Sequence, residues 1–257
     1  MRILIVTQYF YPENFKSNDL AFELQKRNHN VTVLTGLPNY PRGKIYKDYG
    51  IFKKRKEIIN GVKVYRSLII PRGNASGVRL FINYYSFAFF ASIKAFFLGL
   101  NNHYDAVIVH EPSPITQFYP ALLIKKIWKT PIYFWVMDLW PETLSVAGGI
   151  QNKLVLKYYN SVVTSFYNNS EKILITSRGF KKSILKKGDF EKKIIYFPNW
   201  AEDVISEGNK KCLIPELPKG FKIMFAGNLG ESQDLENILN AFLELKSNKN
   251  IKLILVG

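Results

Sequence analysis

Three carboxylate side chains lie in two short polar segments of this sequence. Asp138 and Glu142 belong to WVMDLWPET, directly after the apolar run 132–136, and Glu111 belongs to HEPSP, after the apolar run 105–109. A carboxylate beside a buried strand is costly to desolvate unless it has a polar task, such as accepting a proton from an attacking hydroxyl or orienting a sugar. The alternative is that Asp138 caps a turn or pairs with a basic residue. Residue types alone leave both interpretations open, with Asp138 and Glu111 as the catalytic candidates.

Further polar residues follow the predicted strands. In open parallel sheets ligands bind beyond the C-terminal ends of the strands, so residues at these positions are candidates for substrate binding. They are Asn14, His110, Glu142 and Asn199. A lone histidine such as His110 is more often structural. In AGNLG, the turn at Gly227 and Asn228 joins a strand to a helix N-terminus, where main-chain N–H groups favour an anion such as a diphosphate, although glycine turns after strands are common.

The motifs that the sequence lacks exclude several classes of protein. No G-x-G-x-x-G follows the first predicted strand, which argues against a dinucleotide-dependent oxidoreductase. No Walker lysine motif occurs either. No cluster of Cys and His could hold a metal, so neither a metal nor a cofactor is expected. The single cysteine, Cys212, excludes an internal disulfide and fits a reducing compartment.

Short apolar runs alternate with amphipathic segments, which predicts an α/β fold with a parallel sheet covered on both faces. Strands are expected at 2–7, 30–35, 62–66, 105–109, 132–136, 172–176 and 193–197, and helices at 17–28, 78–101, 115–128, 151–169 and 178–187. Ser17 is expected to cap the first helix. The region 36–61 interrupts the alternation and is expected to contain a strand pair near 51–59.

The chain is expected to comprise two domains. Residues 1–200 form the first, 201–220 a linker without periodicity, and 221–257 the strand–helix–strand start of a second. A two-stranded parallel sheet hardly buries a core. The sequence is therefore interpreted as the front part of a longer two-domain protein.

The chain is strongly basic, with a net charge of +16. This balance favours an anionic partner, either nucleic acid, anionic lipid headgroups or phosphorylated substrates, unless the lysines are only a solvated surface. The aromatic segment 80–100 is nearly long enough to span a bilayer but carries Lys94 near its middle. A helix that faces the core or lies on the membrane surface is favoured over a spanning one.

Several segments, in the same order along the chain, resemble glycosyltransferase family 4. They are MRILIVTQYFYPEN, HNVTVLTG, PNYPRGK, DLWPET, FPNWAED and FAGNLG. The similarity is greatest to bacterial enzymes of capsule and O-antigen assembly. The resemblance implies a GT-B fold of two Rossmann-like domains, the N-terminal one for the acceptor and the C-terminal one for a nucleotide-sugar. It also implies retention of anomeric configuration and no metal ion.

The resemblance also assigns individual residues. Many family members have a catalytic histidine where this chain has Met137, which leaves Asp138 as the candidate base. Gln233 lies where many have a phosphate-binding lysine, and Asn228 where they have an arginine. Diphosphate binding is therefore expected to depend on main-chain amides and on basic residues such as Lys16. The family's paired glutamates would lie beyond Gly257, so the chain by itself is expected to be inactive.

The predicted function is transfer of a sugar from a nucleotide-diphospho-sugar, most often a UDP-sugar in such relatives, to an acceptor. The acceptor is expected to be a polyprenyl-diphosphate-linked saccharide, and the protein to be cytoplasmic and peripheral at the inner face of the cell membrane. Two alternatives remain, a catalytically silent scaffold of a polysaccharide-synthesis complex and a charge-driven nucleic-acid-binding protein. The second is disfavoured because most aromatics lie in apolar runs rather than between exposed cations.

Overall fold

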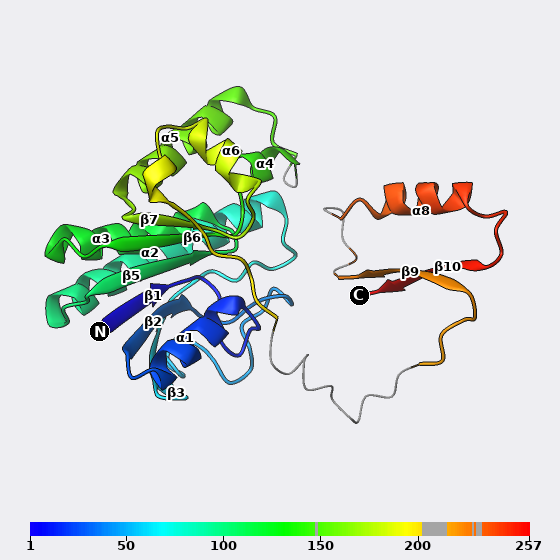
Figure 1. The fold of residues 1–257 in the computed structure, drawn as a ribbon. Helices are drawn as coiled ribbons and strands as arrows, with labels where there is room; N and C mark the ends of the chain where they lie inside the picture. The colour runs from blue at the N-terminus through cyan, green and yellow to red at the C-terminus, as the bar shows by residue number, and fades with distance from the viewer. Residues whose placement is uncertain (147–148, 202–214, 228, 230–232) are drawn as a thin grey trace. The chain divides into compact units, whose positions relative to one another are not determined.

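The computed structural model describes residues 1–146, 149–201, 215–227, 229 and 233–257. The chain divides into two compact units (Figure 1). The first comprises Met1–Leu144 and Ile150–Asn199, and the second comprises Ser145–Gly149 and Trp200–Gly257. Each unit is described by itself.

The first unit is built on an eight-stranded sheet of order β3-β4-β2-β1-β5-β6-β7-β8. Its strands are β1 (Arg2–Val6), β2 (Asn30–Gly36), β3 (Lys56–Ile59), β4 (Val62–Ser67), β5 (Ala106–Glu111), β6 (Ile132–Val136), β7 (Lys172–Ile175) and β8 (Ile194–Tyr196). Neighbouring strands are parallel, except that β3 pairs antiparallel with β4. The predicted α/β fold with a largely parallel sheet is confirmed.

Helices cover both faces of this sheet (Figure 1). They are α1 (Lys16–Lys26), α2 (Gly77–Asn101), the 3-10 turn η1 (Ile115–Phe118), α3 (Tyr119–Trp128), α4 (Glu142–Val146), α5 (Lys153–Asn169), α6 (Phe180–Leu185) and the 3-10 turn η2 (Glu191–Lys193). Alternate β1 residues enter different cores, as expected for side chains of period two. Ile3 and Ile5 pack with Ala21 of α1, whereas Leu4 and Val6 pack in the cluster that includes Phe87 of α2.

Four local expectations were wrong or incomplete. Strand β5 does not end at position 109: it continues through His110 and Glu111, which pair with Trp135 and Val136 of β6, because the ladder tolerates polar side chains. The strand pair does not lie within 51–59, since β3 pairs with β4 across the turn at 60–61. Ser17 does not cap α1, whose N-cap is Phe15; its hydroxyl is directed to the Tyr9 carbonyl at 3.4 Å. The short helix α4 was not anticipated.

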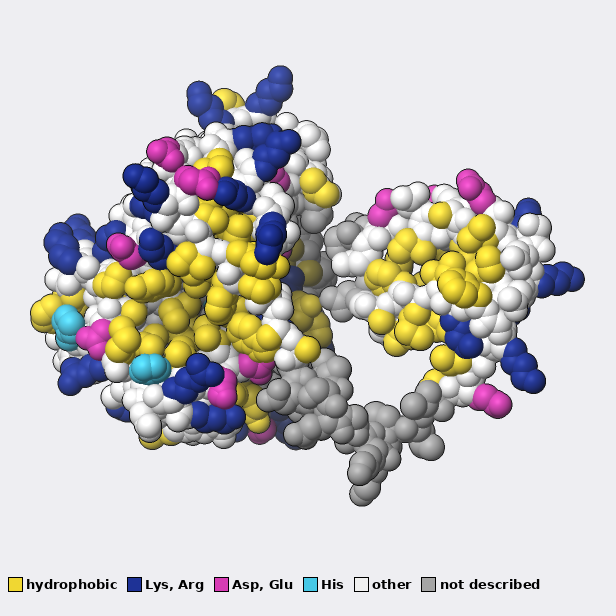
Figure 2. Space-filling model, in the orientation of Figure 1, with side chains coloured by type: hydrophobic (Ala, Val, Ile, Leu, Met, Phe, Trp, Pro, Cys, Tyr) yellow, Lys and Arg dark blue, Asp and Glu magenta, His cyan; other side chains and the backbone are white. Residues whose placement is uncertain are grey.

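Helix α2 has an unusual apolar surface. Its 25 residues are long and apolar enough to cross a membrane by length and composition, with 28% of the most apolar window buried. One face packs into the core through Phe87, Ala91 and Ala95, so α2 is an integral helix of the α/β unit. Large apolar side chains remain exposed on the same helix: Val78, Phe81, Phe89, Ile93, Phe96, Phe97 and Leu100. In the view of Figure 2, hydrophobic side chains gather in a band on the first unit, with Lys and Arg at its borders.

The second unit contains a two-stranded parallel sheet and one helix in its described part. β9 (Phe221–Ala226) pairs with β10 (Ile251–Val256) in the register Phe221 to Ile251, and α8 (Leu235–Glu244) connects them. This is the strand–helix–strand arrangement that the sequence predicts. Gly227 follows β9 directly, and its N–H donates to the Val256 carbonyl at 2.9 Å.

Candidate active site

The carboxyl ends of β1 and β5 meet at the point where the strand order reverses. β1 has β2 on one side and β5 on the other, the arrangement in which open α/β sheets bind ligands. Two buried contacts join these strand ends: Thr7 Oγ1 lies 3.3 Å from His110 Nδ1, and the Gln8 N–H donates to Gln117 Oε1 at 2.7 Å. Buried polar side chains, here called the polar floor (Thr7, Gln8, His110 and Gln117), therefore lie under the carboxyl ends of these strands, where an apolar core would be expected.

Helix α2 is tied into this floor. The side-chain amide of Gln8 donates to Asn83 Oδ1 at 2.8 Å, and the Asn83 amide donates to the Ile70 carbonyl at 2.6 Å. Both side chains are buried. Buried amides that satisfy each other in this way position the backbone around them, so the β1 loop, the β4 loop and α2 are held together at the strand ends.

Asp138 lies two residues after β6, at the same edge. Its Oδ2 accepts a hydrogen bond of 2.7 Å from Ser113 Oγ, which follows β5, and the Trp140 indole N–H donates to that same hydroxyl at 3.0 Å. The hydroxyl therefore directs its proton at the carboxylate. Partial burial raises the pKa of Asp138, and the Ser113 hydrogen bond opposes that rise. The result is a fixed, partly exposed carboxylate of increased basicity.

Glu111 lies beside Asp138 but is entirely buried. Desolvation is the larger cause that raises its pKa well above the ordinary range, the charge of Asp138 adds to it, and nearby main-chain N–H groups oppose it. Neither carboxyl oxygen has a hydrogen-bond partner of good geometry among the described residues. The pKa of both carboxyl groups is thus raised by burial, and the rise is the larger for Glu111, which is the more deeply buried.

His110 is also buried beneath the edge. Desolvation lowers its pKa to about 3, so the imidazole is neutral at physiological pH. Its ring packs against Trp135, with 4.6 Å between the ring centroids. The imidazole is fully buried and contacts Thr7, so it supports the strand ends, and a role in substrate binding stays a prediction.

Glu13 was not identified from the sequence, yet it joins two loops of the site. It lies in the loop after β1, is 3% exposed, and accepts from the N–H groups of Asn39 at 2.8 Å and Tyr40 at 2.6 Å, which follow β2. Burial is the main cause that raises its pKa to about 7, against the effect of these two bonds. Its only sequence signal was a charged residue between Pro12 and the first helix.

A titration of stability should reveal this carboxyl group. The folded protein retains the Glu13 proton between pH 4.5 and about 7, whereas the unfolded chain releases it near 4.5. The contribution of Glu13 to the free energy of unfolding is therefore fully present below pH 4.5. It is lost as the pH rises to about 7, and the total loss is about 3 kcal/mol. Glu13→Gln should remove this part of the pH dependence, measured as the free energy of unfolding at pH 4 to 8. Glu23→Gln, at an exposed position of α1, is the matched control. If the free energy of unfolding of Glu13→Gln changes with pH in parallel with that of the native protein, the assignment is contradicted.

Arg72 is a second residue that sequence reasoning missed. It follows β4, and its guanidinium carbon lies 5.0 Å from the centre of the Tyr40 ring. The main-chain N–H of Arg72 donates to Asn39 Oδ1 at 3.1 Å. Burial raises the pKa of Tyr84, the charge of Arg72 opposes that rise, and the charges of Asp138 and Glu111 add to it. A half-buried cation therefore lies on the Asp138 side of the sheet edge. Its segment, IIPRGN, contains Pro and Gly on either side of the arginine, which is typical of a loop after a strand. This pattern is the sequence signal by which Arg72 could have been identified as a site residue.

The other predicted residues lie apart from this cluster. Asn14 and Asn199 are exposed at the ends of loops of the first unit. Lys16 begins α1, with its ammonium 4.0 Å from the Asp19 carboxylate. Gly227 and Gln233 belong to the second unit, and Asn228 lies outside the described residues.

Glu142 has a structural partner. Its carboxylate accepts from the Lys187 ammonium at 2.6 Å and also from the Ser183 hydroxyl. Burial by itself raises the pKa of Glu142, but these two contacts outweigh that effect, so the pKa of the carboxyl group is lowered. The pair joins α4 to α6, so a role in substrate binding stays a prediction. Among the described residues no group of three His, Cys, Asp or Glu side chains is placed to hold a metal.

The sheet order, the loops at the switch point and the second strand–helix–strand unit define a GT-B type α/β protein. No family model matches the chain. It is 23% identical over 257 residues to "Putative colanic acid biosynthesis glycosyl transferase WcaI" of Escherichia coli (strain K12), covering 94% of this chain and 62% of that protein. It is 24% identical over 124 residues to "Probable glycosyltransferase WbjE" of Pseudomonas aeruginosa, covering 45% of this chain and 31% of that protein. The chain thus spans less than two thirds of the length of these relatives.

Solved structures share the fold. Sucrose-phosphate synthase from Thermosynechococcus elongatus has a TM-score of 0.67 at 12% identity, over 100% of this chain and 62% of that one. The calicheamicin glycosyltransferase CalG4 has a TM-score of 0.53 at 12% identity, over 99% of this chain and 63% of that one. The predicted GT-B fold is confirmed, and the similarity to bacterial polysaccharide glycosyltransferases agrees with the resemblance to glycosyltransferase family 4.

Proposed function

We propose that this chain is the acceptor-side part of a glycosyltransferase of bacterial surface-polysaccharide assembly. The enzyme moves a sugar from a nucleotide-diphospho-sugar, with UDP as the expected nucleotide, to a polyprenyl-diphosphate-linked saccharide. Transfer proceeds with retention of configuration and without a metal ion. The relatives named above support the reaction class, and the retaining course and the lipid-linked acceptor come from the resemblance to family 4.

The observation that carries this proposal is the carboxylate of Asp138. It is partly exposed at the carboxyl edge of the sheet, after β6 and next to the switch point, it is held by Ser113, and its basicity is increased by burial. An acceptor hydroxyl in hydrogen-bond reach of this group would lose its proton to Asp138 as the bond to the sugar forms. The charge of Asp138 also raises the pKa of neighbouring Glu111, after burial, so protonation of Glu111 would limit repulsion within the pair.

The donor diphosphate needs cations and N–H groups. Arg72 and Lys16 are two cations of the first unit near the strand ends. The Gly227 N–H already donates to the Val256 carbonyl at 2.9 Å, so a role of this turn in binding the diphosphate would need other main-chain groups. Arg72 is the better candidate of the two for binding the diphosphate, because its guanidinium is half-buried and lies over the Tyr40 ring.

Direct assay tests the reaction class. The full-length protein is incubated with UDP-, GDP- and dTDP-sugars and a lipid-linked saccharide extracted from bacterial membranes, and the product is analysed by mass spectrometry. We expect one sugar to be added, with the anomeric configuration of the donor retained in the NMR spectrum. Residues 1–257 alone are expected to add none. An inverted product would contradict retention, and hydrolysis without transfer would contradict the acceptor class.

Association with the membrane is proposed through α2. Phe89, Phe96 and Phe97 are 62%, 43% and 57% exposed, so they contribute little to the core. Replacing all three with Ser should reduce binding of the full-length protein to liposomes while the melting temperature changes little. Phe87→Ala, a buried residue of the same helix, should instead cost about 3–5 kcal/mol of stability. Strong destabilisation by the triple change with unaltered binding would show that this face is core.

The two alternative functions have distinct signatures. A scaffold would bind its partners normally but show no transfer with any donor. A nucleic-acid-binding protein would bind duplexes or single strands with a steep dependence on salt. The similarity to glycosyltransferases named for polysaccharide synthesis favours the enzyme over both.

A further inference from the structure

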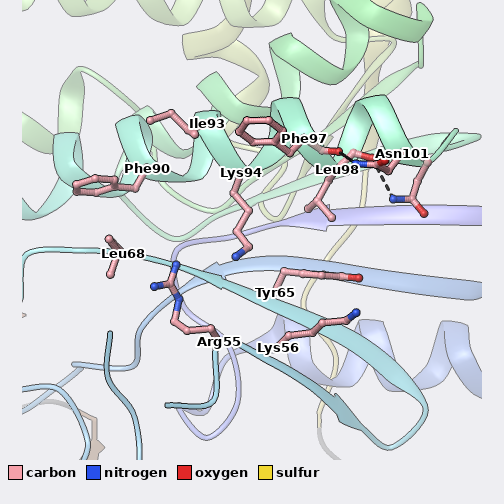
Figure 3. Close-up of a pocket in the computed structure, with 11 residues that line it drawn as sticks. Arg55, Lys56, Tyr65, Leu68, Phe90, Ile93, Lys94, Phe97, Leu98 and Asn101 are labelled. Carbon is pink, nitrogen blue, oxygen red and sulfur yellow. Dashed lines mark hydrogen bonds between the residues drawn. The ribbon is translucent and has the colours of Figure 1, made fainter. Parts of the chain in front are cut away.

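A basic cavity lies between the C-terminal half of α2 and the β3–β4 hairpin (Figure 3). Its volume is about 540 Å³, within the range of sites that bind small molecules. Three cations line it, Arg55, Lys56 and Lys94, and Figure 3 shows Lys94 extending from α2 toward Arg55. No carboxylate is among the lining residues of the described chain.

The cations of this cavity have no anionic partner among the described residues. The Arg55 side chain donates to two main-chain carbonyls, those of Arg66 at 2.8 Å and Ile51 at 3.1 Å, which fixes the guanidinium without neutralising it. The Lys56 ammonium lies 5.5 Å from the centre of the Tyr65 ring. Burial, and then the charge of Arg55, lower the pKa of Lys94. Two half-buried cations that repel each other are stabilised when an anion lies between them.

The other wall of the cavity is apolar and continuous with the exposed face of α2. Phe90, Ile93 and Phe97 line it, and Ile93 and Phe97 are 44% and 57% exposed. A ligand suited to both walls has a compact anionic head and an apolar tail. A free phosphate would leave the aromatic wall in water, whereas a lipid would cover it.

The cavity is separate from the carboxylates of the candidate active site. Asn83, which contacts Gln8 of the site, and Lys94 are on the same helix. Their separation of 11 positions corresponds to about 16 Å along the helix axis. The occupant is therefore not the reacting end of an acceptor bound at Asp138.

We propose that this cavity binds an anionic glycerophospholipid of the bilayer, with its phosphate among Arg55, Lys56 and Lys94 and its acyl chain along Phe90 and Phe97. The inference extends the membrane association proposed above from an apolar face to a defined headgroup site. Its test measures lipid binding alone, so its failure leaves the transferase assignment intact, and transfer to a water-soluble acceptor analogue is measured separately.

The test compares two pairs of substitutions of equal charge in the full-length protein. Arg55→Gln/Lys94→Gln removes the cavity cations, and Lys182→Gln/Lys186→Gln removes two exposed cations at α6. Binding is measured with vesicles of phosphatidylcholine alone or mixed with phosphatidylglycerol. Each cation at a membrane surface is worth about fivefold in affinity, so the cavity pair should lose about 25-fold for the mixed vesicles, and the α6 pair less than twofold.

Further variants and a competition experiment identify the class of ligand. Arg55→Lys/Lys94→Arg should retain binding, and the melting temperature of each variant identifies any that fails to fold. Soluble glycerol 3-phosphate should compete only weakly, because it has no tail to cover the apolar wall. Equal losses for the two Gln pairs would indicate diffuse electrostatics and overturn the proposal. Full competition by glycerol 3-phosphate would overturn the lipid assignment in favour of a phosphate site.

Discussion

Asp138→Asn should reduce turnover of the full-length enzyme by at least a hundredfold. The asparagine retains the shape of the side chain and can still accept the Ser113 hydrogen bond, but it lacks the charge and the basicity. General-base catalysis typically contributes about 10²- to 10⁴-fold, so this change removes most of it. The melting temperature and the affinity for the nucleotide-sugar should stay near those of the native protein, since neither depends on a proton transfer.

Glu111→Gln is the internal control for that assignment. Glu111 is fully buried and its raised pKa keeps the proton on, so a neutral glutamine imitates the form that the fold already favours. Turnover should fall far less than for Asp138→Asn. If Asp138→Asn turns over normally and Glu111→Gln is inactive, the base is Glu111. If neither change matters, the departing phosphate deprotonates the acceptor and Asp138 is a turn residue.

Arg66→Met should lower the free energy of unfolding by about 3–5 kcal/mol. Arg66 is fully buried in β4, pairs with Glu57 of β3 at 2.6 Å, and donates to the Tyr11 carbonyl at 2.7 Å. Methionine fills much of the volume but leaves the Glu57 carboxylate and that carbonyl without their donor, and an uncompensated charge costs far more than the intact pair contributes. Chemical denaturation of the purified protein measures the loss.

The double change Arg66→Met/Glu57→Leu separates this cause from poor packing. With both charges removed, stability should recover by more than half of the loss in the single variant. A double variant as unstable as Arg66→Met would show that the cost is in packing. Arg66 also lowers the pKa of Glu13, so the single change should move the stability titration of Glu13 to higher pH.

The sequence predicted well those features that depend on local pattern. Runs such as RILIV and IYFWV are rich in β-branched and aromatic residues and form buried strands whatever packs on them, so the sheet and the position of Asp138 after β6 followed directly. The end of β5 was not predicted correctly, because the polar residues after position 109 were taken to mark the end of the strand. His110 and Glu111 continue the ladder, since the main-chain bonds to β6 do not depend on the side chains.

Features that depend on tertiary contacts could not be predicted. Glu13 joins two loops only because the loop after β2 brings two N–H groups to its carboxylate. The charge of Arg72 affects the pKa of Tyr84 only because the segment after β4 and α2 lie near each other. Neither association has a signature in spacing. Ser113 appeared as one hydroxyl between two prolines, and its role depends on Trp140, 27 residues later.

The direction of α2 has a consequence for how the enzyme would meet its acceptor. α2 connects β4 to β5 and runs back along the sheet, with Asn83 near the carboxyl edge and Asn101 near the start of β5. With this helix lying flat on a bilayer, as proposed, the strands also lie roughly parallel to the membrane plane. The carboxyl edge would then open sideways along the lipid surface, so that an acceptor diffusing laterally in the leaflet would arrive at Asp138 without leaving the bilayer.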